Sequence, residues 1–390
     1  MKSRSWIIIA VAVVMVGIFS FALTASAWEK GHIKVVPWAK YQQRWDSNVF
    51  YDRDDPQHDW MSITTPGIIG EFGFGPEGKH KLRVDYSVEL AAFYRFTDQN
   101  YGNHNLDTGA FLDFEDYTLD LNNNFKFTSS RAGTEFQARN LRKEDTATAV
   151  LGWHYNKIDF DTGYKFYVVD YLSDTLNALD YYYNEGWITG YVQVAPKTQA
   201  LLEFDYKNFQ YWNVGGRNAN AFAILTGVRG KITPKIDGTV KLGYKSKFYN
   251  GSATSSNNFY GFVAGMDLFY DMNERVDMTL SYYREPYEST YGNNNFYIGD
   301  HLVYGLVYDI GNNFTGILNT FWFHNSYESP GFGESRKRLD DEAEIMPRLE
   351  YAWKDYLVVG VDYKFHQRWS NMHSRGYTQH VFDADVKLMF

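Results

Sequence analysis

Few side chains in this sequence have types and spacing suited to chemistry. His373, Ser374 and Arg375 are consecutive, and His154 lies near an expected turn. A nucleophilic triad also needs a carboxylate that the fold brings to the serine and histidine, and the sequence places no such set. There is no nucleophile elbow, phosphate loop or HExxH motif, and no cysteine for a thiolate site or covalent haem attachment. We therefore expect neither an enzyme nor a cofactor.

One acidic cluster could in principle hold a cation. It consists of Asp52, Asp54, Asp55 and Asp59. Carboxylates are ligands for Ca²⁺, but a dedicated calcium loop has fixed ligand spacing and a central glycine, which this segment lacks. A solvated acidic loop is the better interpretation, and no metal site is predicted.

Most other charged residues alternate with apolar ones. Between residues 81 and 96, the even-numbered positions from Leu82 to Phe96 are apolar, whereas Lys81, Arg83 and Asp85 occupy the opposite face. The same period of two recurs near residues 116–127, 236–245, 275–282 and 342–353. This period is that of a β-strand, and no sustained helical period is present in the chain after residue 27.

One apolar and one polar face predict strands between lipid and water, as in a membrane barrel with a polar lumen. The candidates for lining the lumen carry both signs, which argues against a strong selectivity. They are Lys81, Arg83, Asp85, Glu89, Asp116, Asp120, Lys241, Lys245, Glu342, Glu344, Arg348, Asp362, Lys364, Asp383 and Asp385.

The connections predict the strand number. Eight short turns are expected near residues 75–79, 128–131, 156–157, 196–198, 233–234, 271–274, 311–312 and 354–355. Nine longer loops are expected near residues 46–57, 97–108, 141–146, 173–177, 213–218, 250–257, 288–294, 328–338 and 370–376. We therefore predict an all-β fold: an antiparallel transmembrane barrel of 18 strands over residues 28–390, with 16 strands as the second choice and both termini in the periplasm.

The first 27 residues have the pattern of a cleaved signal peptide. Lys2 and Arg4 precede an apolar stretch over residues 6–23, and Ala25-Ser26-Ala27 fits a cleavage site. A permanent membrane anchor is the alternative. A secreted barrel chain is expected in the cell outer membrane, in contact with its lipid. The net charge of −9 argues against a protein that binds nucleic acid.

The last strand carries the most specific signal. Apolar residues from Phe382 to Phe390 alternate with more polar ones, and the chain stops on the aromatic ring. This ending resembles the assembly signal that the barrel-assembly machinery of bacterial outer membranes reads. The alternative is a soluble secreted β-sandwich, which would have to cover all of these apolar faces.

Tyrosine, phenylalanine and tryptophan make up 18% of the chain. Clusters such as Tyr181-Tyr182-Tyr183 and Phe321-Trp322-Phe323 lie near expected strand ends, where aromatic girdles meet the membrane–water interface. A carbohydrate-stacking surface is the alternative interpretation of individual rings.

The opening strands resemble a known family. Tyr41, the run Arg44-Trp45-Asp46-Ser47-Asn48-Val49-Phe50, then Asp59 and Thr65-Pro66-Gly67, resemble the first strands of the β-barrel porin 2 family of Gram-negative outer-membrane proteins. The resemblance implies a barrel without catalytic residues that is associated with exopolysaccharide export. Its partners would then be a polysaccharide or a periplasmic export protein. A general diffusion porin, and a barrel that holds a partner such as a separate cytochrome, are the alternatives.

Overall fold

A computed structural model describes residues 28–250, 258–292 and 294–390. The predicted signal peptide, residues 1–27, lies outside the described residues, so its cleavage stays a prediction.

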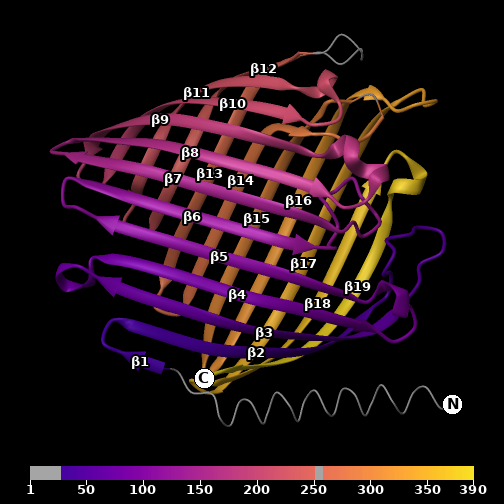
Figure 1. Cartoon of the computed structure of the whole chain (residues 1–390), viewed down its shortest axis with the longest axis horizontal. Helices are drawn as coiled ribbons and strands as arrows, with labels where there is room; N and C mark the ends of the chain where they lie inside the picture. Colours follow the sequence, from indigo (N-terminus) through magenta and orange to yellow (C-terminus); the bar gives the residue numbers. More distant parts are fainter. Residues whose placement is uncertain (1–27, 251–257, 293) are drawn as a thin grey trace.

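The described chain is almost entirely β-sheet (Figure 1). The first nine strands of the wall are β2 (Ile33–Asp46), β3 (Asp59–Phe74), β4 (His80–Phe93), β5 (Tyr101–Asp113), β6 (Tyr117–Thr128), β7 (Arg142–Tyr155), β8 (Ile158–Tyr171), β9 (Tyr181–Ala195) and β10 (Thr198–Tyr211). The other nine are β11 (Ala219–Thr233), β12 (Ile236–Tyr249), β13 (Phe259–Asn273), β14 (Val276–Glu288), β15 (Phe296–Gly311), β16 (Phe314–Pro330), β17 (Lys337–Lys354), β18 (Leu357–Ser370) and β19 (Tyr377–Met389). Short 3₁₀ turns are η1 (Pro76–Gly78), η2 (Thr97–Gln99), η3 (Asp174–Leu179), η4 (Gly215–Arg217) and η5 (His373–Arg375).

The sheet closes on itself. Each strand pairs antiparallel with the next, and β19 pairs with β2 in a register that runs from Val381↔Asp46 to Met389↔Trp38. The backbone N–H of Phe390 extends this seam by donating to the carbonyl of Pro37 at 2.9 Å. Closure leaves no strand edge for lipid to meet, which is the requirement for a β-structure in a membrane. The predicted all-β barrel of 18 strands is confirmed.

An additional short strand, β1 (Trp28–Lys30), was not predicted. It pairs with the start of β2, in the register Trp28↔Val35, through a tight turn in which Gly31 has a φ of +63°. Three residues are too few to show a period of two in the sequence.

The two ends of the barrel differ. Neighbouring strands are joined at one end by turns such as 156–157 and 312–313, and at the other by longer segments (Figure 1). Asn156, Asn312 and Asn313 have positive φ values, as a tight hairpin requires. Leu388 pairs with Leu357, beside the turn at 355–356, so β19 ends at the turn end, where β2 begins. Short turns face the periplasm in outer-membrane barrels, and this places the loops outside the cell.

Three predicted connections were wrong. Residues 101–108 are part of β5 rather than a loop, residues 128–131 open a long loop rather than a short turn, and residues 142–146 belong to β7. The missed turn is 114–116, where Glu115 has a φ of +70°. The sequence of β5 is rich in Asn, Gly and Asp, which favour turns in water but are tolerated where a strand faces a polar lumen.

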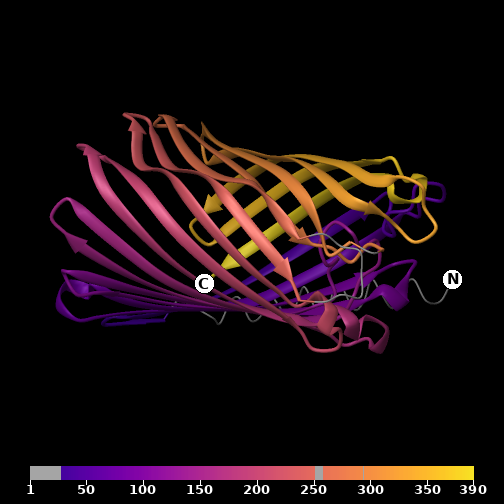
Figure 2. The same ribbon diagram turned by 90° about the horizontal axis from the view of Figure 1, so that it is seen from above.

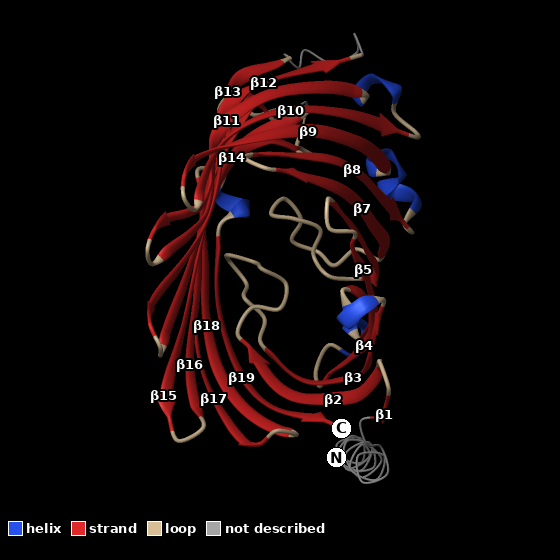
Figure 3. Ribbon diagram, turned by 90° about the vertical axis from the view of Figure 1, so that its left-hand side faces the viewer, coloured by secondary structure: helices blue, strands red, loops and turns tan. Residues whose placement is uncertain are grey.

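The strands cross the wall obliquely (Figure 2). Viewed along the barrel, the wall has an elongated outline, and loops from the far end lie within that outline (Figure 3). Large apolar side chains on one face of the wall are about half exposed, among them Leu242 at 48%, Phe262 at 53% and Ile224 at 54%. That face is the outer one, because the other face contacts the loops inside the barrel.

Candidate functional site

The inner face of the wall carries charged side chains that are mostly paired. Arg83 meets Glu71 at 2.8 Å, Lys241 meets Glu203 at 2.6 Å, and Lys245 meets Glu285 at 3.3 Å. These contacts link neighbouring strands or cross one intervening strand along the same face. The inner wall therefore carries alternating charges that largely compensate each other.

The densest network on this wall involves residues named in the sequence analysis. Arg348 contacts Asp362 at 2.8 Å and Asp385 at 2.6 Å, and Arg44 on the neighbouring β2 holds Asp383 at 2.9 Å. The structure thus brings Arg348, Asp362, Asp383 and Asp385 to one region across β17, β18, β19 and β2. Arginine is suited to such positions because its planar group binds carboxylates in a fixed geometry.

The other candidates lie elsewhere on the inner face. Lys364 lies 3.8 Å from Glu344, and Glu89 accepts a bond from Asn103 at 3.3 Å. On β4 Asp85 is 3.4 Å from Arg83, and on β6 Asp120 accepts a bond from Asn122 at 2.6 Å. Lys81 lies at the turn end, beside a cavity of about 620 Å³ at the barrel mouth.

The prediction for Asp116 was wrong. This residue is exposed in the turn 114–116 between β5 and β6, where its backbone N–H bonds the carbonyl of Phe114. The alternation of apolar and polar residues along β6 continues through Asp116 in the sequence. The period of two therefore did not show where the turn ends and the strand begins.

The loop over residues 129–141 connects β6 to β7 and is folded into the lumen. At its start, the guanidinium carbon of Arg131 lies 3.8 Å from the ring centroid of Tyr51, and its Nη1 donates to the hydroxyl of Tyr377 at 3.1 Å. Cation–π contacts of this kind gain strength when water is excluded. Arg131 therefore joins the loop to the wall near β19 and to the loop between β2 and β3.

The middle of this loop reaches β16 and the loop that follows β14. Glu135 is buried at 9% exposure and accepts bonds from Ser289 Oγ at 2.7 Å, from the backbone N–H of Thr290 at 2.6 Å and from Thr290 Oγ1 at 2.8 Å. Beside it, Asn325 donates to Thr134 Oγ1 at 3.3 Å. A buried carboxylate without such donors would cost several kcal/mol, so these bonds fix the position of the loop.

The end of the loop contacts a third part of the wall. The guanidinium of Arg139 lies over the rings of Tyr101, at 4.0 Å, and Phe93, at 5.4 Å. Gln137 donates to the backbone carbonyls of Tyr51 and Ser374. Contacts with β4, β5, β16 and β19 from one loop mean that it crosses the lumen and narrows its outer half.

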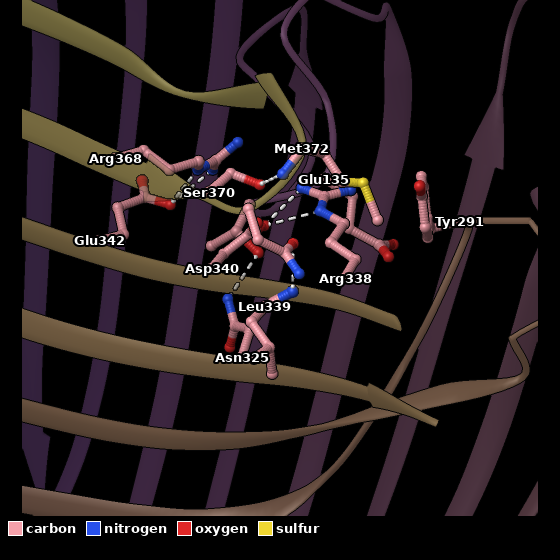
Figure 4. Close-up of polar contacts among 12 residues, drawn as sticks. Glu135, Tyr291, Asn325, Arg338, Leu339, Asp340, Glu342, Arg368, Ser370 and Met372 are labelled. Carbon is pink, nitrogen blue, oxygen red and sulfur yellow. Dashed lines mark hydrogen bonds and ion pairs between the residues drawn. The ribbon is translucent and has the colours of Figure 1, made fainter. Parts of the chain in front are cut away.

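A buried polar cluster lies on the inner face near this loop (Figure 4). Arg338 and Asp340 are each fully buried, and Arg338 Nε donates to Asp340 Oδ2 at 2.8 Å. Next to them, Arg368 Nε donates to Glu342 Oε2 at 2.9 Å, and His366 Nε2 lies 2.7 Å from Glu342 Oε1. Pairing is what makes such deep burial of charge tolerable.

Glu342 was among the sequence candidates, but Arg338, Asp340 and Arg368 were not. Alternation along β17 placed Arg338 and Asp340 on the face of Glu342, and that signal was available. The burial of these three side chains could not be predicted from the sequence, because it depends on loops that are far away along the chain.

The aromatic clusters are only partly girdles. In the run Tyr181-Tyr182-Tyr183 the first and third side chains face the lumen, and Tyr181 stacks on Tyr211 with ring centroids 5.0 Å apart. Tyr182 lies on the outer face of the barrel, near Phe166. The same holds for Phe321-Trp322-Phe323, of which Trp322 is 43% exposed on the outer face. A run of three aromatics in a strand must divide between both faces, since side chains alternate.

Comparison with known sequences decides the family. The sequence profile described as "Putative beta-barrel porin 2" matches residues 29–390. The chain belongs to this family. It is a porin-like barrel channel of the outer membrane, from a family of channels rather than enzymes, and the resemblance noted in its first strands is confirmed.

Matching solved structures include proteins of two organisms. OpdL of Pseudomonas aeruginosa has 13% identity and a TM-score of 0.46, with 92% of this chain and 98% of that chain covered. OccAB4 of Acinetobacter baumannii has 11% identity and a TM-score of 0.47, with coverages of 93% and 99%. No curated protein matches the sequence. Among the described residues, none forms a helix long and apolar enough to cross a membrane.

Proposed function

We propose that this barrel is a passive channel for small hydrophilic solutes. The observation that supports it best is a closed 18-strand wall with a polar inner face, narrowed by the loop 129–141. A barrel of this strand number is wider than its own side chains can fill. The solute would therefore follow a wet path whose narrowest part lies beside the loop.

The charges support a path of weak ion preference. Carboxylates and basic groups on the inner wall meet each other at salt-bridge distance, as Arg348 does with Asp362 and Asp385. Paired charges project a weaker field into the lumen than a ring of one sign would. Neutral and weakly charged solutes fit such a lining.

Polysaccharide export, the role implied by the family resemblance, makes a further demand on the structure. A polymer chain would need a continuous wide passage, and the contacts of Arg131, Glu135 and Arg139 hold a loop across the outer half. Export would therefore require this loop to move, whereas the small solutes proposed above pass beside it. A periplasmic export partner belongs to the same alternative.

A barrel that sheaths a separate cytochrome is a second alternative. Such a partner would need the space in the lumen that the loop 129–141 occupies. A general diffusion porin would show no preference for neutral over strongly charged solutes of equal size, and uptake rates for a series of such solutes separate it from the proposed channel.

The test combines uptake with genetics. Purified barrel in liposomes should let small sugars and amino acids enter, with rates that fall steeply as solute size increases. In the producing bacterium, deletion of the gene should slow uptake of a small solute and leave surface polysaccharide unchanged. Loss of surface polysaccharide with intact uptake would overturn the proposal in favour of export.

A further inference from the structure

A partly open pocket lies beside the loop 129–141, and Glu135 of the loop lines it. Its volume is about 220 Å³. One side is formed by the loop residues 132–136, another by tyrosines of β8, β9 and β10, and a third by residues 288–290. Drug-sized ligands occupy pockets of roughly 300–1,000 Å³, so this volume suits a smaller molecule.

The wall of the pocket is a surface of tyrosine rings. Tyr167 lies 5.7 Å from Tyr181 between ring centroids, and Tyr181 stacks on Tyr211 at 5.0 Å. Tyr171 also lines the pocket and contacts Phe136 of the loop at 6.1 Å. Each tyrosine offers an apolar ring together with a hydroxyl, which suits a ligand with both C–H surfaces and hydroxyl groups.

Two of the three carboxylates at the pocket are matched by a cation. Glu288 is bonded by Lys247 and by the hydroxyl of Tyr211, and Glu144 is bonded by Arg142. These carboxylates therefore add little net charge, while their oxygens remain acceptors.

The remaining charged groups at the pocket are the carboxylate of Glu135 and the guanidinium of Arg217. Ser289 contacts both, since its hydroxyl donates to Glu135 at 2.7 Å and its carbonyl accepts from Arg217 Nη2. Within the described part of the chain, Arg217 Nε is buried and has no hydrogen-bond partner. The charges around the pocket are thus nearly balanced, and Arg217 is one of its lining residues.

We propose that this pocket binds a small neutral polyhydroxylated solute, of the size of one sugar ring. Balanced charge disfavours both an organic cation and an anion, because either would add a net charge to a site that is largely shielded from water by the loop and the wall. The tyrosine rings pack against C–H groups, while Glu144, Arg217 and the tyrosine hydroxyls serve the hydroxyl groups. The inference rests on the proposed channel, since the site lies where the loop narrows the path.

The test measures binding without requiring conduction. Folded protein in detergent is titrated calorimetrically with D-glucose, D-galactose and D-mannose, and with choline and inorganic phosphate for comparison. At least one hexose should bind, and choline and phosphate should not. Tyr167→Ala should weaken hexose binding by about tenfold, because it removes a ring from the pocket wall. Tyr167→Phe keeps the ring and should weaken binding less.

The matched control is Tyr164→Ala on the same strand. Tyr164 is 49% exposed on the outer face, so its removal should leave hexose affinity unchanged. Heat-modifiable migration on gels verifies that each variant is folded. Binding of choline or phosphate in preference to the hexoses, or no binding of any hexose, would overturn the inference.

Failure of this inference and failure of the proposed function are distinguishable. A barrel that admits small solutes into liposomes but binds no hexose keeps the channel and loses the site. A barrel that binds a hexose but admits no solute keeps the site and loses the channel.

Discussion

Glu135 and Ser289 are 154 residues apart in the sequence, and the hydroxyl of Ser289 donates to the carboxylate of Glu135 at 2.7 Å. The bond joins a loop that leaves the wall at β6 to the segment after β14. A loop fixed at both of its ends and at this distant point cannot lie flat against its own side of the barrel. The lumen is therefore shaped by long-range contacts of a few polar side chains.

Removing the Glu135 contacts should widen the channel. Glu135→Ala deletes the acceptor of three bonds and leaves the hydroxyl protons of Ser289 and Thr290 and the Thr290 N–H without that acceptor, at a cost of about 1–3 kcal/mol for a buried group. We expect a larger single-channel conductance and more frequent fluctuations. Glu274→Ala, an exposed residue in the turn 274–275, serves as control and should behave as the native chain. Identical conductance of the two variants would contradict the role given to the loop.

A covalent lock tests whether the loop has to move. The native sequence contains no cysteine, so Thr134→Cys with Asn325→Cys introduces the only thiols, at a contact that is 3.3 Å in the native protein. We expect oxidation to leave small-ion conductance and small-solute uptake nearly unchanged, because the path lies beside the docked loop. Closure of the channel on oxidation, reversed by reductant, would show that passage needs a displaced loop and would favour export of a polymer.

The buried pair of Arg338 and Asp340 should dominate local stability. Arg338→Ala leaves a fully buried carboxylate without its cation, which costs about 3–5 kcal/mol. Unfolding by urea in lipid vesicles measures this loss. Arg336→Ala makes the same change at an exposed position two residues earlier and should cost less than 1 kcal/mol, a rough bound for surface sites. Equal losses in the free energy of unfolding for the two variants would contradict the role given to burial of the pair.

The register of β14 predicts an asymmetry between neighbouring residues. Leu280 pairs with Leu268 and Tyr304 on the outer face, whereas Thr279 faces the lumen and pairs with Gly305. Leu280→Arg should destabilise the barrel by roughly 2–4 kcal/mol, as arginine facing the bilayer midplane does, and Thr279→Arg should be mild. The free energy of unfolding in vesicles compares the two variants, and a larger loss for Thr279→Arg would show that the faces are exchanged.

The wall was predictable from sequence because its physics is local. Alternation around Leu242 and Leu280 reports the face of each strand directly, and turns such as 156–157 have asparagine where the backbone needs a positive φ. The first half of β5 was predicted to be a loop because its polar residues are as well suited to a loop as to a strand that faces a polar lumen.

The interior was not predictable, for a physical reason. Arg131 and Glu135 look like ordinary loop residues, and their partners Tyr377 and Ser289 lie far away along the chain. The contacts exist only once closure has brought these segments into one lumen. Recognition of Phe390 by the assembly machinery stays a prediction, since the structure gives only its backbone bond to Pro37.

The central claim is that the lumen is a water-filled path narrowed by the loop 129–141. Single-channel recording of the purified barrel in planar lipid bilayers tests it most directly. The account predicts discrete, stable openings with a nearly linear dependence of current on voltage, and a higher conductance when Glu135→Ala releases the loop. Absence of any conductance from folded protein, in both the native chain and this variant, would contradict it.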